Sequence, residues 1–575
     1  MKYRLLTWTL LVFLLCSGLT GFSRAGLKIC SAGNHLSWDD PAAWRIVQNG
    51  TTGAVTPQGD DTIMVRHEIL MYNNFELNTG KLIIEKEGSL LAPGCTVNIS
   101  SDAAGECSGR LEVLNLTVKG SASFLLMPEG KVTVNGLLHV DAGALFTLQD
   151  SKNKQGSLIT YGPVEGNVSA GYSVPANENL LVSSPVSGAE SGVFLNMYLR
   201  NYNEQKSGWG EYIVPTTVPL NPMQGYEVLS TYEDYRNFTG VPLSGEQKIA
   251  ITSDGDGWNL VGNPYPSSID WSLLGNGYDH GDFPPGMSTI YYWDPSGSGN
   301  FSVFCAGEEP ICINNGSPVV HPMQGFFVKA GVSGEISTTN KMRIHAEDGD
   351  FVAPLPLSAL KFKIEGNNFS DEAVVRFNPD ASGDFDIAYD AYELQGFNTA
   401  PGIYTTLADG SKLAINTLGS VSSGSIIPID VIIPYAGISV IKVQGASAFE
   451  FRYPVYLEDE STGIYTDLRA DSVYSFESEN GDPVRHFKLH FALPGGIQEN
   501  ETNTISVTAG GSAIDIKDAE GRSGIIEVFT VDGKRIFRSA VTSLAAVKIP
   551  VSPGRVYITR IETGEKVETC KLYCY

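Results

Sequence analysis

Between residues 27 and 161 the chain consists of short segments in which apolar and polar side chains alternate. Lys81-Leu82-Ile83-Ile84-Glu85 and Gly130-Lys131-Val132-Thr133-Val134 are examples, and Gly, Asn or Asp residues separate the segments. Alternation with a period of two is typical of β-strands. Repeated strands of this length predict a β-solenoid-like domain over residues 26–165, in which each coil stacks on its neighbour. An ordinary β-sandwich is the alternative interpretation of the same pattern.

The composition favours an all-β chain with several domains. The 575 residues include 62 Gly and 30 Pro, and only 18% of them are charged. Gly and Pro form tight turns, whereas aromatic and β-branched residues favour strands. A chain of this length is too long to fold around a single hydrophobic core, so we expect several domains. A net charge of −25 argues against nucleic-acid binding, because a phosphate-binding face needs basic residues.

A repeat occupies the middle of the chain. Leu180-Leu181-Val182-Ser183-Ser184-Pro185 aligns with Asn259-Leu260-Val261-Gly262-Asn263-Pro264. Asn221-Pro222-Met223-Gln224-Gly225-Tyr226 aligns with His321-Pro322-Met323-Gln324-Gly325-Phe326, at a larger offset, so the second copy carries insertions. We expect two related all-β units, residues 166–245 and 246–345, or two halves of one sandwich.

Two further strand-rich regions follow the repeat. Residues 350–495 end in Phe487-Lys488-Leu489-His490-Phe491, whose alternation is that of a strand with one buried face. We expect a β-sandwich there. Residues 497–575 alternate in the same way, and Val531-Asp532-Gly533-Lys534 predicts a hairpin turn between two strands. The expected fold class is therefore all-β, with a solenoid-like domain, tandem β-sandwich units and a small C-terminal β-sandwich.

Aromatic residues of the repeat are candidates for binding sugars. A flat ring can stack on the apolar face of a pyranose while its polar atom stays hydrated. Packing in the sandwich core is the competing explanation for the same residues. The stacking candidates are Trp258, Trp271, Trp293 and Tyr292.

Cysteines and carboxylates supply the other candidate sites. Cys95 with Cys107, and Cys305 with Cys312, would close short loops as disulfides if the chain is exported. Alternate carboxylates around a glycine can ligate calcium, and Asp380, Asp384 and Asp386 are so placed. A solvated turn is the alternative for these three residues. No other cofactor is expected.

Catalytic motifs are missing from the sequence. It contains no Gly-x-Ser-x-Gly elbow, no His-Glu-x-x-His pair and no phosphate-binding loop. A pair of glycosidase carboxylates would leave no sequence signature. We therefore assign no catalytic residue.

The N-terminus has the pattern of a secretory signal peptide. Lys2 and Arg4 precede an apolar run from Leu5 to Leu15, which is too short to span a membrane. Small residues then precede the predicted cleavage site between Ala25 and Gly26. The alternative is a lipid anchor at Cys16, although the bulky Leu15 disfavours it.

Residues 497–575 resemble the C-terminal sorting domain of the Bacteroidetes type IX secretion system. The resemblance rests on the Asp532-Gly533 hairpin and on Pro553-Gly554-Arg555-Val556-Tyr557, in which the glycine sits one position early. The opening segment Trp38 to Trp44 resembles β-solenoid surface domains of the eight-glycine type. The resemblance implies an Ig-like C-terminal β-sandwich that engages the type IX machinery. It also implies a secreted or outer-membrane cell-surface protein that passes through the periplasm on its way out. After the sorting domain is removed, such a protein is released or attached to anionic lipopolysaccharide.

Three functions are compatible with these observations. The first is a non-enzymatic modular surface protein of the stalk or adhesion type, exported by the type IX route. The second is a glycan-binding surface protein that uses the aromatic residues of the repeat. The third is a polysaccharide-degrading enzyme with its site on the solenoid. The missing catalytic motifs favour the first.

Overall fold

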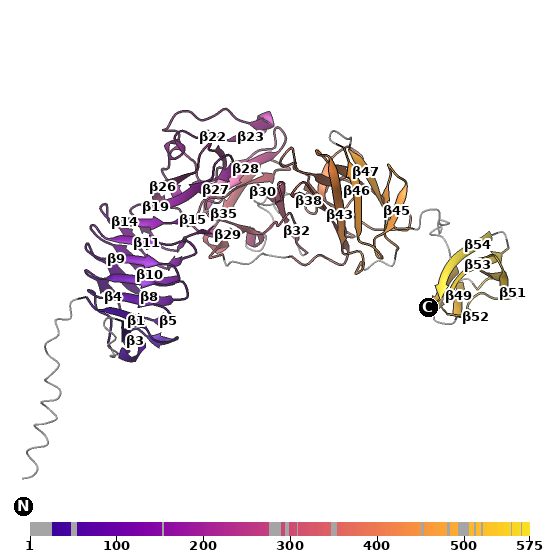
Figure 1. Ribbon diagram of the computed structural model, residues 1–575, viewed down its shortest axis with the longest axis horizontal. Coiled ribbons are helices and arrows are strands. Elements are labelled where there is room, and N and C mark those ends of the chain that lie inside the picture. The colour runs from indigo at the N-terminus through magenta and orange to yellow at the C-terminus, as the bar shows by residue number, and fades with distance from the viewer. Residues whose placement is uncertain are drawn as a thin grey trace, which may run out of the picture.

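The all-β fold is confirmed by the computed structural model, which shows β-strands and a few short 3-10 helices (Figure 1). The predicted signal peptide, which ends at Ala25, lies outside the described part of the chain, which begins at Gly26. The structure describes residues 26–47, 55–151, 154–274, 289–293, 298–306, 309–346, 353–449, 453–479, 484–492, 505–510, 513–518, 521–553, 555–564 and 566–574.

The predicted β-solenoid is present and has parallel sheets along its sides. Leu90, Leu111, Val132 and Leu158 face one another in register on neighbouring strands and are fully buried, so each coil extends the core of the one before. One sheet contains β1 (Lys28–Ser31), β4 (Thr62–Val65), β7 (Lys81–Ile84), β9 (Ala104–Cys107), β11 (Ser123–Leu126) and β14 (Leu145–Leu148). The second contains β2 (Leu36–Ser37), β5 (Glu68–Leu70), β8 (Ser89–Ile99), β10 (Arg110–Val118), β12 (Lys131–Val134) and β17 (Ser157–Thr160). In this second sheet, β6 (Phe75–Leu77) and β13 (Leu138–Val140) pair with the C-terminal halves of β8 and β10, and β18 (Val164–Glu165) pairs with β13.

The first coil is closed by two tryptophans. The rings of Trp38 and Trp44 meet edge to face at 5.0 Å, and the Trp44 indole N–H donates to the Trp38 carbonyl oxygen at 2.9 Å. Strand β3 (Trp44–Ile46) pairs antiparallel with β1, unlike the parallel coils that follow. The segment thus ends the stack of parallel strands on this side.

The two copies of the repeat have the same strand topology. In the first copy β25 (Tyr226–Leu229) lies between β20 (Asn179–Val182) and β22 (Tyr198–Arg200). In the second, β34 (Gly325–Lys329) lies between β28 (Trp258–Gly262) and β30 (Thr289–Trp293), and β31 (Phe301–Cys305) and β32 (Ile311–Ile313) extend the sheet. An outer antiparallel pair accompanies each copy. The pairs are β19 (Val168–Val174) with β26 (Asp234–Pro242), and β27 (Gln247–Ile251) with β35 (Gly334–Thr338).

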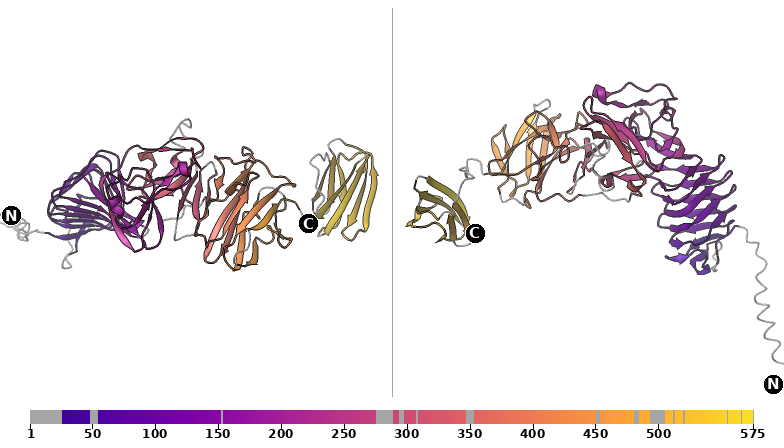
Figure 2. Two further views of the ribbon diagram at one scale, coloured as in Figure 1. Left: turned by 90° about the horizontal axis from the view of Figure 1, so that it is seen from above. Right: turned by 180° about the vertical axis from the view of Figure 1, so that it is seen from behind.

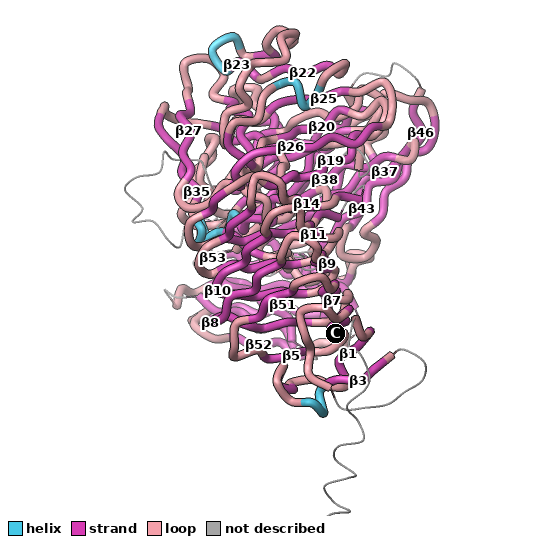
Figure 3. The backbone as a smooth tube through the Cα atoms, turned by 90° about the vertical axis from the view of Figure 1, so that its left-hand side faces the viewer, coloured by secondary structure: helices cyan, strands magenta, loops and turns pink. Residues whose placement is uncertain are grey.

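Strand β19 belongs to the solenoid and to the repeat at once. It pairs in parallel with β14, the last coil strand of its sheet, and antiparallel with β26 of the first copy. The sheet therefore runs from the coils into the repeat without a break (Figure 3).

The Pro-Met-Gln-Gly motifs hold the two copies together by reciprocal contacts. The Gly262 N–H donates to the Met223 carbonyl oxygen at 2.8 Å, and the Ser183 N–H donates to the Met323 carbonyl oxygen at 2.8 Å. Gly262 and Ser183 are equivalent positions in the alignment. Both methionines are buried and have positive φ, +58° and +60°, a conformation that non-glycine residues adopt rarely. The copies thus form two sheets related by an approximate two-fold axis.

The third β domain follows the repeat. Phe362, Phe487 and Phe491 are central in its core. The Asn314 amide joins it to the second copy by donating to the Asp371 carboxylate at 2.8 Å. Its sheet contains β37 (Ala359–Gly366), β38 (Phe369–Phe377), β39 (Ala391–Tyr392), β40 (Gly402–Thr406), β41 (Lys412–Leu418), β42 (Ile426–Ile432), β43 (Gly437–Gln444), β44 (Tyr456–Asp459), β45 (Ile464–Asp467), β46 (Val473–Ser478) and β47 (Arg485–His490).

The C-terminal β-sandwich has its own hydrophobic core around Ile514, Ile526 and Leu544. The Asp532-Gly533 turn is a hairpin in which Gly533 has a φ of +80° and donates its N–H to Thr530. Tyr557 is buried, and its hydroxyl donates to the Ser552 carbonyl oxygen at 3.0 Å. Pro553 lies in the bend before β53, and Gly554 is outside the described residues. The two sheets are β48 (Ile505–Gly510), β49 (Ala513–Asp518) and β52 (Val547–Pro550), and β50 (Gly524–Thr530), β51 (Arg535–Val541), β53 (Arg555–Thr563) and β54 (Lys566–Cys574).

Candidate functional site

A large cleft lies where the solenoid, the repeat and the third β domain meet. Figure 2 shows the bend of the backbone between the solenoid and the rest of the chain. Its volume is about 1590 Å³. Small-molecule sites usually enclose about 300–1,000 Å³, so this space suits an extended ligand better than a single small one. The solenoid contributes Lys86, Arg110 and Lys131, the repeat contributes Trp293, and the third domain contributes Lys361.

Two of the four sugar-stacking candidates line this cleft. Trp293 is half-buried and packs edge to face against Phe397 at 4.9 Å. Its indole nitrogen is buried and finds no hydrogen-bond partner among the residues that the structure describes. The neighbouring Tyr292 is 8% exposed and its hydroxyl donates to the Asn315 carbonyl oxygen at 3.3 Å. Of the two, Trp293 is the residue with surface to offer a ligand.

The other two candidates lie elsewhere. Trp271 is 1% exposed and packs against Phe326 at 5.0 Å, so it belongs to the core and corrects the expectation of a stacking role. Trp258 is half-buried, with the Tyr291 ring 4.9 Å away and the Lys329 ammonium 4.9 Å above its face. A face already covered by a cation is poorly placed to take a sugar.

The solenoid supplies the floor of the cleft as a column of polar side chains. Ser89, Arg110, Lys131 and Ser157 begin four neighbouring parallel strands and are in register with one another. The first side chain of each strand faces outward, because the second is a buried apolar residue. Two cations therefore lie side by side on adjacent strands.

Several carboxylates of the cleft are already engaged. Glu129 forms ion pairs with Lys86 and Lys154, and Glu372 pairs with Lys361 at 3.0 Å. Asp150 accepts the Ser173 N–H at 2.6 Å, while burial raises its pKa. These groups have hydrogen-bonding roles in the fold.

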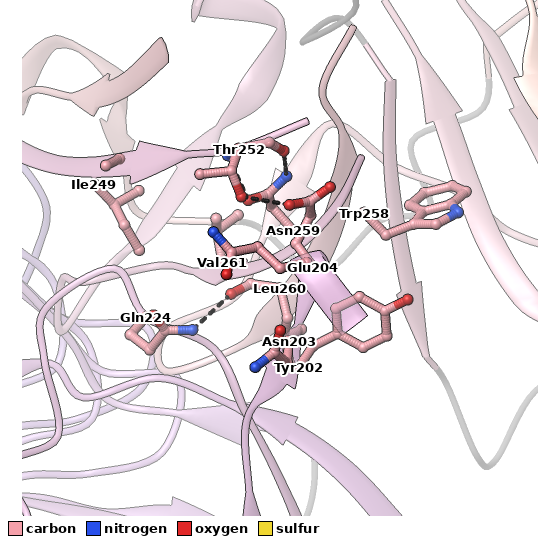
Figure 4. A pocket seen from close by; sticks show the side chains of 12 residues that line it. Tyr202, Asn203, Glu204, Gln224, Ile249, Thr252, Trp258, Asn259, Leu260 and Val261 are labelled. Atoms are coloured by element: carbon pink, nitrogen blue, oxygen red, sulfur yellow. Dashed lines mark hydrogen bonds between the residues drawn. The ribbon is translucent and has the colours of Figure 1, made fainter. Parts of the chain in front are cut away.

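A smaller pocket of about 210 Å³ lies between the two copies of the repeat (Figure 4). Glu204 of the first copy enters it and is 7% exposed. Its carboxylate accepts the Thr252 hydroxyl at 2.7 Å and the N–H groups of Asp254, Gly255 and Gly257 at 3.3, 2.6 and 2.8 Å. Burial alone would raise the pKa of Glu204, but these four donors lower it. The wall of the pocket that contains Glu204 is thus held by a structural contact between the copies.

Strand β36 (Arg343–Ile344) docks the repeat on the last coil of the solenoid. The Arg343 guanidinium is buried and donates to the carbonyl oxygens of Leu158 and Thr160 at 2.8 and 2.9 Å. It also donates to Ser267 and to Asn340. Burial lowers the pKa of Arg343 to about 10, so it is charged at neutral pH.

His345 lies beside the cationic floor. One ring nitrogen is 2.8 Å from the Ser157 hydroxyl and the other is 2.9 Å from the Thr133 hydroxyl. Burial lowers its pKa to about 3, and the charges of Lys131 and Arg110 contribute. His345 is therefore neutral at physiological pH.

The two predicted disulfides are wrong, because all four cysteines are free thiols. Cys305 pairs in register with Ile311, so Cys312 is one position out of register and its side chain points to the opposite face of the sheet. Cys95 and Cys107 lie on β8 and β9, which belong to different sheets of the solenoid.

The calcium site is also not formed. Within the described ranges, no group of three or more His, Cys, Asp or Glu side chains is placed to hold a metal ion. Asp380 and Asp384 are exposed. Asp386 instead donates its N–H to the Asp390 carboxylate at 2.8 Å, which closes the turn without a cation. The solvated turn is the better interpretation.

Sequence reasoning missed the residues that join the domains. Glu204 and Arg343 stand in no motif. Glu204 finds its partners about 50 positions away, and Arg343 finds two of its partners in the last coil of the solenoid. The one signal for Glu204 is the Asp254-Gly255-Asp256-Gly257 turn, whose successive N–H groups can surround an anion.

Comparisons with known proteins identify a family. A sequence profile described as "Domain of unknown function (DUF8693)" matches residues 93–491, which extend from the solenoid to the end of the third β domain. No curated protein matches the chain. Among solved structures, a β-1,2-glucanase from Parabacteroides distasonis aligns at 11% identity over 30% of this chain and 36% of that one, with a TM-score of 0.10. In the part of the chain that the structure describes, no helix has the length and hydropathy to cross a membrane.

Proposed function

Because the chain belongs to the family described as "Domain of unknown function (DUF8693)", whose description names no activity, we propose its function from its own architecture. The protein is a non-enzymatic, modular cell-surface protein of the stalk or adhesion type, exported by the type IX secretion system. Its C-terminal sandwich is the sorting domain that the machinery recognises. A signal peptide ending at Ala25 directs the chain to the periplasm first.

The observation that carries this proposal is the separateness of the C-terminal sandwich. The family match ends at residue 491, and residues 505–574 form two sheets around their own core. A module with its own core can fold independently of the rest of the chain, and it can therefore serve as a C-terminal sorting signal that is later removed. The Asp532-Gly533 hairpin and the buried Tyr557 are the residues on which the resemblance to sorting domains rests.

We expect the C-terminal sandwich to be necessary and sufficient for export. In a Bacteroidetes host with an active type IX system, the full chain should reach the surface or medium, starting at Gly26 and lacking the residues beyond about 495. A chain ending at residue 492 should accumulate in the periplasm. Mass spectrometry of the termini in each cell fraction measures both.

A reporter that carries the signal peptide and residues 493–575 is the control for misfolding of the truncated chain, and it should be exported. A full chain that stays in the periplasm with an intact C-terminus would show that the assignment is wrong.

Glycan binding in the cleft is the second candidate, and it rests on Trp293. The residue is only half-buried in a cavity larger than most small-molecule sites. Three of the carboxylates that line the cleft, Glu129, Glu372 and Asp150, are held in ion pairs or hydrogen bonds, which favours a structural over a catalytic role for these three. Attachment or release at the surface would then bring the cleft to external polysaccharide.

Trp293→Ala should weaken retention on an immobilised polysaccharide about two- to twelvefold, because a stacked ring contributes about 0.5–1.5 kcal/mol. Affinity electrophoresis measures the retention. Trp293→Phe keeps a ring and should recover most of it, and Tyr72→Ala, which removes a 69% exposed aromatic outside the cleft, should leave it unchanged. Equal retention of the Trp293→Ala variant and the native protein would contradict the assignment.

A further inference from the structure

We propose that Tyr198, Trp209 and Tyr212 form an exposed aromatic platform on the first copy of the repeat, and that this platform binds neutral polysaccharide. The platform is a second site, because none of its three residues lines the cleft. The inference goes beyond the proposed surface function by naming the class of molecule that such a protein would hold.

The three rings are unusually exposed for aromatic side chains. Tyr198, Trp209 and Tyr212 are 50%, 37% and 49% exposed, and Trp209 is the most exposed tryptophan in the described part of the chain. Leu195 and Val214, at the two ends of the same segment, are also exposed. Apolar residues scattered singly over a surface are normal, whereas a contiguous group marks a site of interaction.

An excursion of the backbone brings the rings together. After β22 the chain runs out along one short strand and returns along another, which are paired with each other: β23 (Tyr202–Asn203) and β24 (Gly208–Trp209). The returning segment remains beside β22, because the Ile213 N–H donates to the Leu199 carbonyl oxygen at 2.8 Å. The rings of Tyr198 and Tyr212 flank this bond, with centroids 5.3 Å apart. Figures 1 and 3 show β22 and β23 at an edge of the molecule.

Arg200 orders the platform from one side. Its guanidinium lies 4.7 Å from the centroid of the Trp209 ring and 5.3 Å from that of Tyr212. An ion pair with Glu227, whose side chain is 8% exposed, fixes the guanidinium in turn. Since the cation covers one face of each ring, the other face and the edge remain for a ligand. Rings that are held in place before binding reduce its entropic cost.

The second copy of the repeat buries the side of the sheet that the first copy leaves open. Glu227 and Phe327 are equivalent positions, because each comes directly after the aromatic residue that follows a Pro-Met-Gln-Gly motif. Glu227 pairs in register with Arg200, and Phe327 with Tyr291. Tyr291 is 1% exposed, and its hydroxyl accepts the Tyr392 N–H of the third domain at 3.0 Å. The first copy thus has a charged pair and exposed rings where the second has a buried contact.

The size of the platform suits a few sugar units better than a protein partner. An aromatic side chain can bury about 150–250 Å², so the exposed fractions of the three rings amount to about 200–340 Å². A standard protein–protein interface takes about 800 Å² from each partner. A pyranose has an apolar face of the size of one ring, and its hydroxyl groups stay in water when that face stacks.

The charges around the platform favour a neutral polymer over an acidic one. The Arg200 charge is balanced by Glu227, and the exposed Glu211 lies next to Tyr212 in the chain. The whole chain carries a net charge of −25, which repels polyanions. Stacking on the rings needs no charge on the ligand.

The test measures retention of the purified mature chain on hydroxyethyl cellulose, galactomannan, dextran and polygalacturonate by affinity electrophoresis. We expect at least one of the three neutral polymers to retain the protein more strongly than polygalacturonate. Tyr198→Ala with Tyr212→Ala should weaken that retention at least about fivefold, because two stacking rings are lost. Tyr198→Phe with Tyr212→Phe keeps both rings and should retain most of the binding. Tyr72→Ala with Tyr465→Ala is the matched control, since it removes two exposed aromatic rings elsewhere and should leave retention unchanged.

Each other outcome overturns a stated part of the inference. If no neutral polymer retains the native chain, or if the double alanine variant is folded and retained like it, the platform is not a polysaccharide site. Stronger retention by polygalacturonate overturns the neutral class. Loss of retention in Trp293→Ala but not in the double alanine variant places glycan binding in the cleft alone. Platform-dependent binding to cells that survives periodate oxidation but not protease identifies a protein partner instead. The purified chain does not have to be exported in this assay, so its result is independent of the export experiment.

Discussion

Arg343→Met should lower the free energy of unfolding of the solenoid and repeat by about 3–5 kcal/mol. Among the described residues no carboxylate pairs with this guanidinium, and four neutral oxygens solvate its charge: those of Leu158, Thr160, Ser267 and Asn340. Methionine fills a similar volume but donates nothing, so buried acceptors lose their hydrogen bonds. The variant no longer has to bury a charge, but this gain in free energy offsets only part of the loss of the hydrogen bonds.

The measurement has to account for a chain with several domains, whose unfolding is not a single transition. Urea unfolding followed by tryptophan fluorescence gives the shift in midpoint, and hydrogen exchange reports whether β17 opens first. Lys341→Met is the matched control, because it removes the same charge from an exposed side chain two residues away. If both variants shift the midpoint equally, Arg343 does not hold the interface.

Glu204→Ala should destabilise the repeat by about 3–4 kcal/mol, since it leaves one hydroxyl and three backbone N–H groups without their acceptor. Glu204→Gln keeps the shape of the side chain and one acceptor oxygen, but its amide nitrogen replaces the other oxygen and faces N–H groups that it cannot accept. We therefore expect about half the destabilisation of Glu204→Ala. Glu211→Gln changes an exposed glutamate nearby and serves as the control. An unchanged unfolding midpoint in Glu204→Ala would contradict the structural role.

At acidic pH the native protein should lose its advantage in stability over the Glu204→Gln variant. The folded state lowers the pKa of Glu204 below its ordinary value of 4.5, so its contribution is fully present above that pH. The contribution is lost as the pH falls through the lowered pKa. The difference in midpoint between the native protein and Glu204→Gln should therefore narrow in acid. A constant difference would mean that the charge is not what the N–H groups recognise.

Alternation in the sequence predicted where the strands lie and which face each one buries, but it did not predict the register in which they pair. Alternation at Lys131 to Val134 gives the strand and its buried face, because both depend on side chains two positions apart. The failed Cys305–Cys312 pairing depends on register between two strands, and one position of offset reverses the face. Composition around the cysteines has no information on that offset.

The candidate site was predicted only in part for a similar reason. Trp293 and Trp271 come from the same aromatic-rich repeat, yet one lines the cleft and the other is in the core. The cleft brings together Arg110, Trp293 and Lys361, which are separated by tens to hundreds of residues and belong to three domains. Only the relative placement of the domains, which depends on contacts such as those of Arg343, creates the space.

The reciprocal contact between the two repeat copies has an evolutionary consequence. Each copy donates the same N–H to the same carbonyl of the other, at Gly262 with Met223 and at Ser183 with Met323. An isologous contact of this kind is what a symmetric homodimer uses. A chain carrying one copy could thus have assembled with a second molecule through the same surface before gene duplication joined them. The two copies now differ in their surroundings: the first continues the solenoid through β19, and the second carries Trp293 at the cleft.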